Sequence, residues 1–154
     1  MGDKGNFPHY MLKEIFEQPE ALRRTISPRV SPNQDVVRLD EVRITPEELR
    51  TLCRINIVAS GTSRHAGIAG QYMIQDLVNL PVEVDYASEF EYRNPPLGKD
   101  ELTIVITQSG ETADTTAAQR EAKAKGSRTI AISNVLESTI AREADGVLYT
   151  NAGP

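Results

Sequence analysis

The sequence has no tryptophan, a single cysteine and only 5% aromatic residues in 154 positions. One cysteine cannot form an internal disulfide, and so few aromatic side chains leave little material for stacking nucleic-acid bases. We expect Cys53, just before an apolar run, to be a buried structural thiol without a chemical role. No apolar run approaches the roughly 20 residues that cross a bilayer, and no signal-peptide pattern is visible. These absences favour a cytoplasmic protein without a membrane partner.

Positive charge is also in short supply. The 17 Lys and Arg residues are scattered, the 22 Asp and Glu residues outnumber them, and the formal net charge is −5. We therefore expect no nucleic-acid partner. The two histidines, His9 and His65, are far apart, and no spacing of His, Cys and carboxylates is typical of a metal site, so neither a metal nor a cofactor is predicted. The length is typical of one domain.

The first third of the chain has an irregular pattern. Residues 7–26 show amphipathic helical spacing, but Pro19 lies inside them and predicts a break or a second helix that begins there. Residues 27–44 contain two prolines and no sustained period, which is typical of a connecting arm. Thr45, followed by a proline and then by Glu48, predicts a capping box at the start of a short helix.

From Arg54 onward, strand-like and helix-like patterns alternate. Strands are expected at residues 55–60, 82–87, 102–107, 128–133 and 146–150, and helices at residues 63–80, 112–125 and 138–145. The first of these helices has one apolar face, which consists of Ala66, Ala69, Met73 and Leu77. The alternation predicts an α/β fold, a three-layer α-β-α sandwich around a five-stranded parallel sheet with right-handed crossovers.

Loops rich in hydroxyl groups follow three of the predicted strands. They are "SGTSRHAG" at residues 60–67, "TQSGETADT" at residues 107–115 and "SNVLEST" at residues 133–139. Ligands of open parallel sheets bind beyond the carboxyl ends of the strands, where hydroxyls and helix N-termini can donate to an anion. Because neither of the first two loops matches the dinucleotide fingerprint or the P-loop, a small sugar phosphate is favoured over a nucleotide.

The same residues also fit a simpler interpretation. Ser and Thr at helix starts are ordinary N-caps, and either loop alone is more often a cap than a ligand site, although two such loops at one edge favour a site. Glu111 is a candidate general base, yet at a helix N-terminus it equally fits a carboxylate that complements the helix dipole. A lone histidine such as His65 at a helix start is more often a capping or surface residue than a catalyst.

The two motifs "SGTSRHAG" and "TQSGETADT", in this order, resemble the sugar isomerase (SIS) domain. Together with "HYMLKEIFEQPEAL", "ASEFEYR" and the terminal "TNAGP", they resemble more narrowly the glutamine–fructose-6-phosphate aminotransferase family, also called glucosamine-6-phosphate synthases. The resemblance covers nearly the whole chain and is weakest across residues 27–52. It implies a flavodoxin-like SIS domain at residues 54–154, preceded by an N-terminal helical arm and connecting segment at residues 1–53.

The resemblance also implies partners. Members of that family join an N-terminal glutaminase domain to two SIS lobes and form dimers, and this chain is similar to the first lobe with its leading arm. Gly2 follows Met1 where the family has a nucleophilic cysteine, and the chain stops at Pro154 where the family continues into the second lobe. We therefore expect an excised lobe that binds a sugar phosphate weakly at best and does not catalyse, because the family's catalytic residues belong to segments outside this chain.

The resemblance assigns residues to fructose 6-phosphate or glucosamine 6-phosphate. Side chains that hold the phosphate are expected at Ser63, Gln108, Ser109 and Thr112, with Thr62 and Gly110 shaping the turns. Thr107 replaces a usual serine and adds a methyl group beside the ligand, and Val135 corresponds to a position whose backbone touches the sugar. Ser60 stands where the family commonly has cysteine.

Two other functions remain open from the sequence. A standalone SIS module that senses a phosphosugar in a regulatory protein is one, although no helix-turn-helix or basic DNA-binding segment supports it. An independent phosphosugar isomerase is the other, and it would require a base from Glu111 or His65, neither of which has an evident orienting partner.

Overall fold

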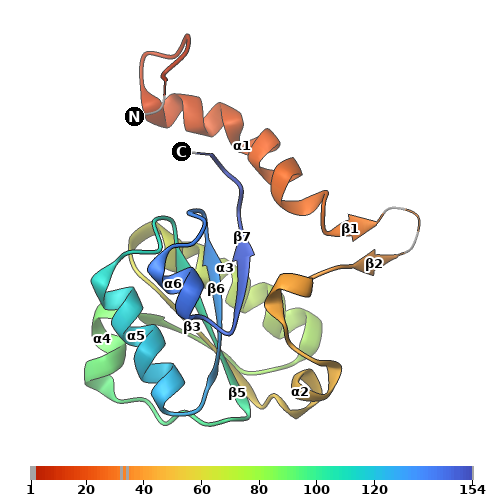
Figure 1. Ribbon diagram of the computed structural model, residues 1–154, viewed down its shortest axis with the longest axis vertical. Coiled ribbons are helices and arrows are strands. Elements are labelled where there is room, and N and C mark those ends of the chain that lie inside the picture. Colours follow the sequence, from red (N-terminus) through yellow and green to blue (C-terminus); the bar gives the residue numbers. More distant parts are fainter. Residues whose placement is uncertain (1–2, 32, 34, 154) are drawn as a thin grey trace.

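The computed structural model describes residues 3–31, 33 and 35–153, and at its centre lies a five-stranded parallel sheet (Figure 1). The strands are β3 (Arg54–Ala59), β4 (Val82–Tyr86), β5 (Glu101–Thr107), β6 (Arg128–Ser133) and β7 (Gly146–Tyr149). Their spatial order is β4-β3-β5-β6-β7, and every neighbouring pair is parallel. The predicted α/β sandwich and its five strands are therefore confirmed.

Helices cover both faces of the sheet. They are α3 (Gly61–Val78), α4 (Ala87–Arg93), α5 (Ala113–Ala124) and α6 (Thr139–Glu143). Figure 1 places α4, α5 and α6 together on one face and α3 on the other. The sequence did not predict α4, because this short helix has no clear apolar period and is held by the packing of Ala87 and Phe90, each 2% exposed.

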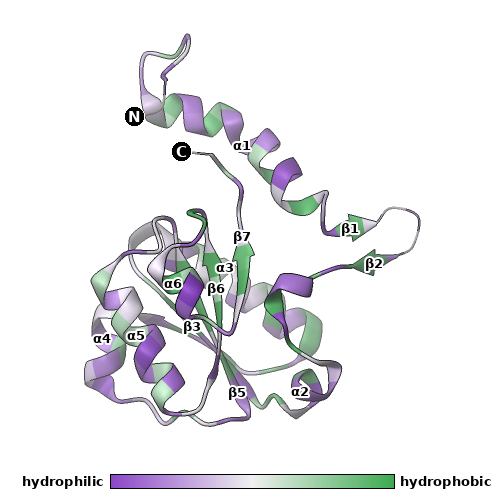
Figure 2. Ribbon diagram, viewed as in Figure 1, coloured by the Kyte–Doolittle hydropathy of each residue, from purple (hydrophilic) through white to green (hydrophobic). Residues whose placement is uncertain are grey.

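β-Branched residues of the strands point alternately to two buried layers, as expected for a parallel sheet covered on both sides. One apolar cluster contains Ile55 and Ile57, and Val42 from the segment before the sheet packs into it at 4% exposure. On the opposite face, Val58 packs with Phe90. Figure 2 shows β6 and β7 in green, as apolar strands of the sheet.

The N-terminal arm begins with α1 (Tyr10–Ile26), which continues through Pro19, so the predicted break is wrong. Proline removes one backbone hydrogen bond, but ion pairs of Glu20 with Arg23 (2.9 Å) and Arg24 (3.2 Å) support the turn that follows. None of the residues of α1 is buried.

A short hairpin and two short helices connect α1 to the sheet. They are β1 (Val30–Ser31), its antiparallel partner β2 (Val36–Val37), the 3-10 helix η1 (Asp40–Val42) and α2 (Pro46–Thr51). The expected connecting arm also contains positions 32 and 34, which lie outside the described residues, as do positions 1, 2 and 154. The capping box is confirmed: the Glu48 amide donates to Thr45 Oγ1 (3.2 Å), and the Thr45 amide donates to Glu48 Oε2 (2.7 Å).

Two expectations about side chains are wrong. Cys53 is exposed, because it lies before the buried part of β3. The predicted apolar face of α3 also points outward, with Met73 65% and Leu77 80% exposed. The helix instead approaches the sheet through Gly67, where a Cβ would lie 2.9 Å from Ile57 Cγ2. So close an approach needs a glycine rather than large apolar residues, which the apolar period cannot reveal.

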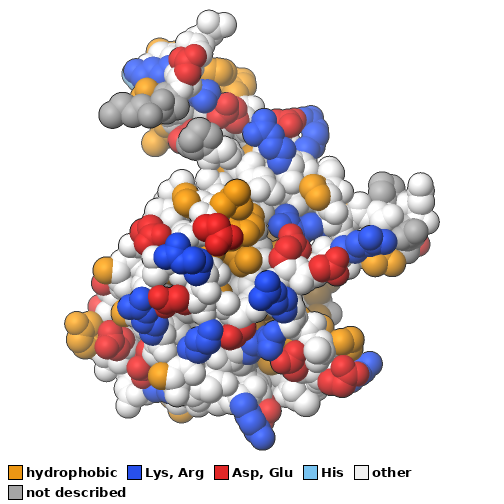
Figure 3. Space-filling view, viewed as in Figure 1, with side chains coloured by type: hydrophobic (Ala, Val, Ile, Leu, Met, Phe, Trp, Pro, Cys, Tyr) orange, Lys and Arg blue, Asp and Glu red, His pale blue; other side chains and the backbone are white. Residues whose placement is uncertain are grey.

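The surface in Figure 3 carries interspersed charges of both signs, as the scattered basic residues predict. On the outer helices, Arg120 pairs with Glu143 (2.6 Å) and Lys123 pairs with Asp145 (2.9 Å). Arg120 lowers the pKa of the Glu143 carboxyl below its usual value. Among the described residues, no helix is long and apolar enough to cross a membrane.

Candidate functional site

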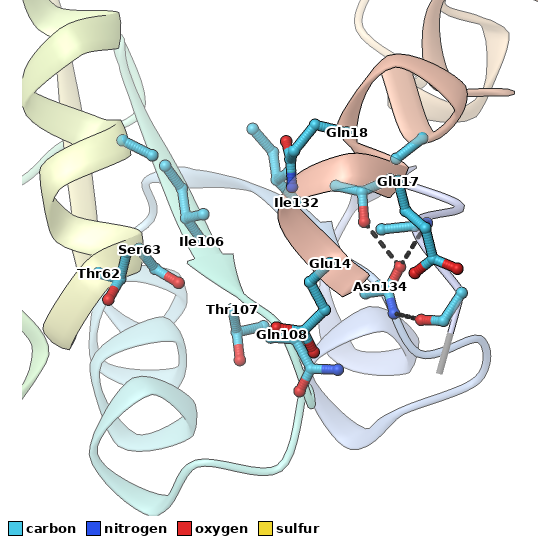
Figure 4. Close-up of a pocket in the computed structure, with 15 residues that line it drawn as sticks. Glu14, Glu17, Gln18, Thr62, Ser63, Ile106, Thr107, Gln108, Ile132 and Asn134 are labelled. Carbon is cyan, nitrogen blue, oxygen red and sulfur yellow. Dashed lines mark hydrogen bonds between the residues drawn. The ribbon is translucent and has the colours of Figure 1, made fainter. Parts of the chain in front are cut away.

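A cavity of about 680 Å³ opens where the carboxyl ends of the strands meet the N-terminal arm (Figure 4). One wall comes from the start of α3 and the end of β5, and it includes Thr62, Ser63, Thr107 and Gln108. The opposite side is formed by α1 and by the chain that follows β6 and β7, with the polar residues Glu14, Glu17, Gln18, Asn134 and Thr150. Ala152 and Gly153 complete this second side.

A smaller cavity of about 250 Å³ adjoins the first and shares Ser63, Thr107 and Gln108 with it. Its polar lining consists of hydroxyl groups and one amide, from Ser60, Ser63, Thr107, Gln108, Ser109, Thr112 and Thr115. Six of the eight residues expected from the sequence line one or both of these cavities, and Gly110 lies in the turn between two of them, Ser109 and Thr112, without lining either. The eighth, Val135, is 42% exposed and lines neither of them.

In the loop after β5, two hydroxyl oxygens accept hydrogen bonds from backbone amides, which leaves their own hydrogens free to be donated. The Gly110 amide donates to Thr107 Oγ1 (3.1 Å), and the Glu111 amide donates to Ser109 Oγ (3.3 Å). A hydroxyl that accepts through its oxygen can still donate its O–H to a ligand. Thr107 and Ser109 are therefore prepared to donate into the small cavity.

The N-caps of the two long helices at this site are Ser60 for α3 and Thr112 for α5, and neither side chain makes a capping hydrogen bond. The ordinary-cap interpretation of these two hydroxyls therefore finds no support in the geometry. Both helix N-termini face the site, and their dipoles favour an anion there. Neutral donors and helix dipoles together can bind a phosphate without a cationic side chain.

Gly110 is required by the turn between β5 and α5. Its φ of +69° lies in the left-handed region, and a Cβ at this position would lie 1.9 Å from Ser138 Oγ. The Gly110 carbonyl also accepts a hydrogen bond from the Ile140 amide (3.1 Å). The turn is thus seated directly on the start of α6.

Glu111 is engaged in the same contact between the loop and α6. The Thr139 amide donates to Glu111 Oε1 (2.7 Å). This bond, together with the Thr139 hydroxyl, holds the pKa of the Glu111 carboxyl below its usual value. Glu111 lines neither cavity, and neither does the exposed His65. The geometry favours a structural role for Glu111 over that of a general base.

Several cavity residues were missed from the sequence. Asn134 and Thr150 directly follow β6 and β7, so the rule that ligands bind beyond the strand ends could have found them. Glu14 and Glu17 come from the arm, and no local pattern indicates that α1 lies over the sheet edge. They are the only two ionisable side chains among the described residues that line the larger cavity. The part of the chain described here contains no group of three or more His, Cys, Asp or Glu residues that could hold a metal ion.

Comparison with known proteins agrees with the fold. A family model described as "SIS domain" matches residues 48–154. The glutamine–fructose-6-phosphate aminotransferase (isomerizing) of Clostridium tetani is 54% identical over 152 residues, which cover 99% of this chain and 25% of that protein. The chain thus spans about a quarter of the length of the curated relatives it matches.

Solved structures give the same result. The C-terminal domain of glucosamine-fructose-6-phosphate aminotransferase from Francisella tularensis superposes with a TM-score of 0.88 at 38% identity, covering 99% of this chain and 42% of that one. The sugar isomerase domain of a transcription factor from Sphaerobacter thermophilus gives a TM-score of 0.69 at 20% identity, with 91% and 74% coverage. This second likeness concerns the fold alone.

Proposed function

This chain belongs to the SIS domain family, and on that premise we propose that its two adjoining cavities bind a sugar phosphate, either fructose 6-phosphate or glucosamine 6-phosphate. The observation that carries the proposal is the convergence of hydroxyl groups and two helix N-termini on the smaller cavity. The larger cavity, of about 680 Å³, has room for the sugar. The phosphate would thus lie at the loops and the sugar between the loops and the arm.

In this proposal each predicted site residue has a defined part. Ser63, Gln108, Ser109 and Thr112 donate to the phosphate. Thr107 lies at the edge that the two cavities share, and Thr62 and Gly110 shape the turns. Val135 contributes through its backbone, which the resemblance places near the sugar.

We further propose that the chain is the first SIS lobe of a glutamine–fructose-6-phosphate aminotransferase. That enzyme converts fructose 6-phosphate and glutamine into glucosamine 6-phosphate and glutamate, and its glutaminase domain and second SIS lobe would be the partners of this lobe. The identity of 54% to a relative of that name supports this assignment. A cytoplasmic location and assembly as a homodimer are part of the same proposal.

The lobe is proposed to bind without catalysing. Glu111, the best candidate base from the sequence, is held by the Thr139 amide at 2.7 Å and lies outside both cavities. A proton-abstracting group must reach the substrate, so neither Glu111 nor His65 is suited to the role. The regulatory alternative rests on likeness of fold, whereas the aminotransferase reading rests on sequence identity as well.

Nuclear magnetic resonance titration of the chain tests the proposed site. Backbone amides are followed while fructose 6-phosphate, glucosamine 6-phosphate or inorganic phosphate is added. We expect shifts at residues 61–64 and 107–113 with all three ligands, and further shifts at residues 150–153 with the sugars alone. No response at millimolar ligand would refute a free-standing binding site. Turnover of fructose 6-phosphate by this chain in a coupled isomerase assay would refute the absence of catalysis.

A further inference from the structure

Asn134, the residue that directly follows β6, joins the two sides of the larger cavity. Its backbone N–H donates to the carbonyl of Gln108 (3.2 Å) in the loop between β5 and α5, residues 108–112, which is called the phosphate loop because of the proposed site. Its side chain turns the other way, toward the segment after β7. There its Nδ2 donates to the Gly153 carbonyl (2.7 Å), and its Oδ1 accepts from Thr150 Oγ1 (2.9 Å) and from the Ala152 amide (2.8 Å). Figure 4 shows these side-chain bonds at the cavity wall.

The segment at residues 150–153 depends on this one amide group. Pairing between β6 and β7 ends at Ser133 and Tyr149, and the Thr150 amide makes one more bond to the Ser133 carbonyl (3.0 Å). Beyond that point, each hydrogen bond found for residues 151–153, within the described part of the chain, goes to the Asn134 side chain. Positive φ angles at Asn151 (+50°) and Gly153 (+87°) curve the chain around it.

The same segment also carries the contact with the arm. Thr25 Oγ1 of α1 donates to the carbonyl of Thr150. A continuous series of contacts therefore runs from α1 through Thr150 to the Asn134 side chain, and from the Asn134 backbone to Gln108. The two elements that the series joins both contribute to the cavity lining, α1 through Glu14 and the phosphate loop through Gln108.

We propose that Asn134 is a positioning residue that fixes the wall at residues 150–153 relative to the phosphate loop, and that it thereby sets the affinity for the sugar part of the ligand rather than for its phosphate. This inference rests on the proposed function. The side chain needs both a donor and a double acceptor, which an asparagine amide supplies. Substitution of the Asn134 side chain removes only its bonds to residues 150–153, because the bond to Gln108 comes from the backbone.

The test compares affinities for fructose 6-phosphate and inorganic phosphate in the wild-type chain, Asn134→Ala, Asn134→Asp and Thr150→Val. Asn134→Ala removes all three side-chain bonds, and we expect it to weaken fructose 6-phosphate about tenfold while inorganic phosphate changes less than about threefold. Asn134→Asp keeps the acceptor and loses the donor, so its effect should be intermediate. Leu136→Ala, at a 63% exposed position of the same loop, is the matched control and should change neither affinity.

The ratio of the two affinities separates positioning from general destabilisation, which would weaken both ligands together. An unchanged ratio in Asn134→Ala, with binding by the wild-type chain intact, would overturn the role of Asn134 and leave the proposed function standing. No binding of either ligand by the wild-type chain would overturn both. If Asn134→Ala does not fold, Thr150→Val decides the matter, because it removes one hydroxyl; a shift of about threefold in the same direction supports the inference and an unchanged ratio refutes it.

Discussion

The two walls of the larger cavity are held in place by different means. The two loops of the proposed phosphate site directly follow β3 and β5 and are called the phosphate loops. Val58 of β3 and Val105 of β5 are completely buried. The facing helix, α1, has no buried residue. Among the residues that the structure describes, one hydrogen bond joins it to the sheet domain, from Thr25 to Thr150. Apolar packing therefore fixes the groups that are proposed to bind a phosphate, whereas a polar contact places the arm. Substitutions in the two regions should therefore differ in their effects on stability and on ligand binding.

The largest difference is expected between two phenylalanines. Phe90 is 2% exposed under α5, and Phe90→Ala should lower the free energy of unfolding by about 3–5 kcal/mol because it leaves a cavity in the core. Phe16 on α1 is 66% exposed and stacks on Phe7 with centroids 5.6 Å apart, so Phe16→Ala should cost about 1 kcal/mol or less. Urea denaturation measures both. Similar losses would mean that the arm is part of the cooperative core.

The next largest effect is expected from two glycines of the phosphate loops. Gly110→Ala should cost about 2 kcal/mol or more, because a Cβ would overlap Ser138 Oγ and the residue has φ +69°. It should also abolish phosphate binding, since the turn cannot stay seated on α6. Gly61 has φ +54° but open space around it, so Gly61→Ala should cost only about 1 kcal/mol. Equal costs would refute the steric contribution of Ser138.

The same contrast explains how much of the fold was predictable. In runs such as Ile104–Thr107, Val105 and Thr107 are buried on one face and Ile104 and Ile106 are half-buried on the other. The alternation of such β-branched runs with helical patterns predicts a parallel sheet. The hydroxyl loops at the strand ends could be placed together because parallel strands end at a common edge. Features decided by tertiary packing were missed. The buried face of α3 is marked by Gly67, and the helix α4 is held by Phe90.

The candidate site follows the same division. Ser63, Gln108, Ser109 and Thr112 were assigned by resemblance to the family, and the structure brings all four to the smaller cavity because each lies just beyond the end of β3 or β5. Glu14 could not be found, because it lies 94 positions before Gln108 in the sequence. Its place in the cavity depends on how α1 crosses the edge of the sheet. Asn134 was within reach of the strand-end rule, but its side-chain partners lie in the segment after β7, and no short motif records them.

A smaller effect should appear on acidification. The Thr139 amide lowers the pKa of Glu111 below its usual value of 4.5 in the folded chain, so this carboxylate stabilises the fold above the unfolded pKa. The stabilisation is lost as the pH falls through the folded pKa. Glu111→Gln should therefore be less stable than wild type near neutral pH, and the difference should shrink progressively below pH 4.5.

Thermal unfolding across this pH range, with Glu91→Gln at an exposed position of α4 as control, measures the effect. A difference between wild type and Glu111→Gln that stays constant with pH would show that the carboxylate charge is not involved. The substitution should also loosen the phosphate loop, because Glu111 is one of its contacts with α6.

The smallest effect concerns charge on the arm. Glu14 lines the cavity across from Ser63 and Gln108, so its carboxylate should repel a bound phosphate (Figure 4). Glu14→Gln should strengthen fructose 6-phosphate binding about two- to threefold at low salt, and the gain should fade at about 0.5 M salt because exposed charges are screened. Glu17 is paired with Lys13 at 3.3 Å, so Glu17→Gln should gain less. Weaker binding by Glu14→Gln would instead mean that this carboxylate accepts hydrogen bonds from the sugar hydroxyls, and that the loosely held arm grips the ligand as the phosphate loops do.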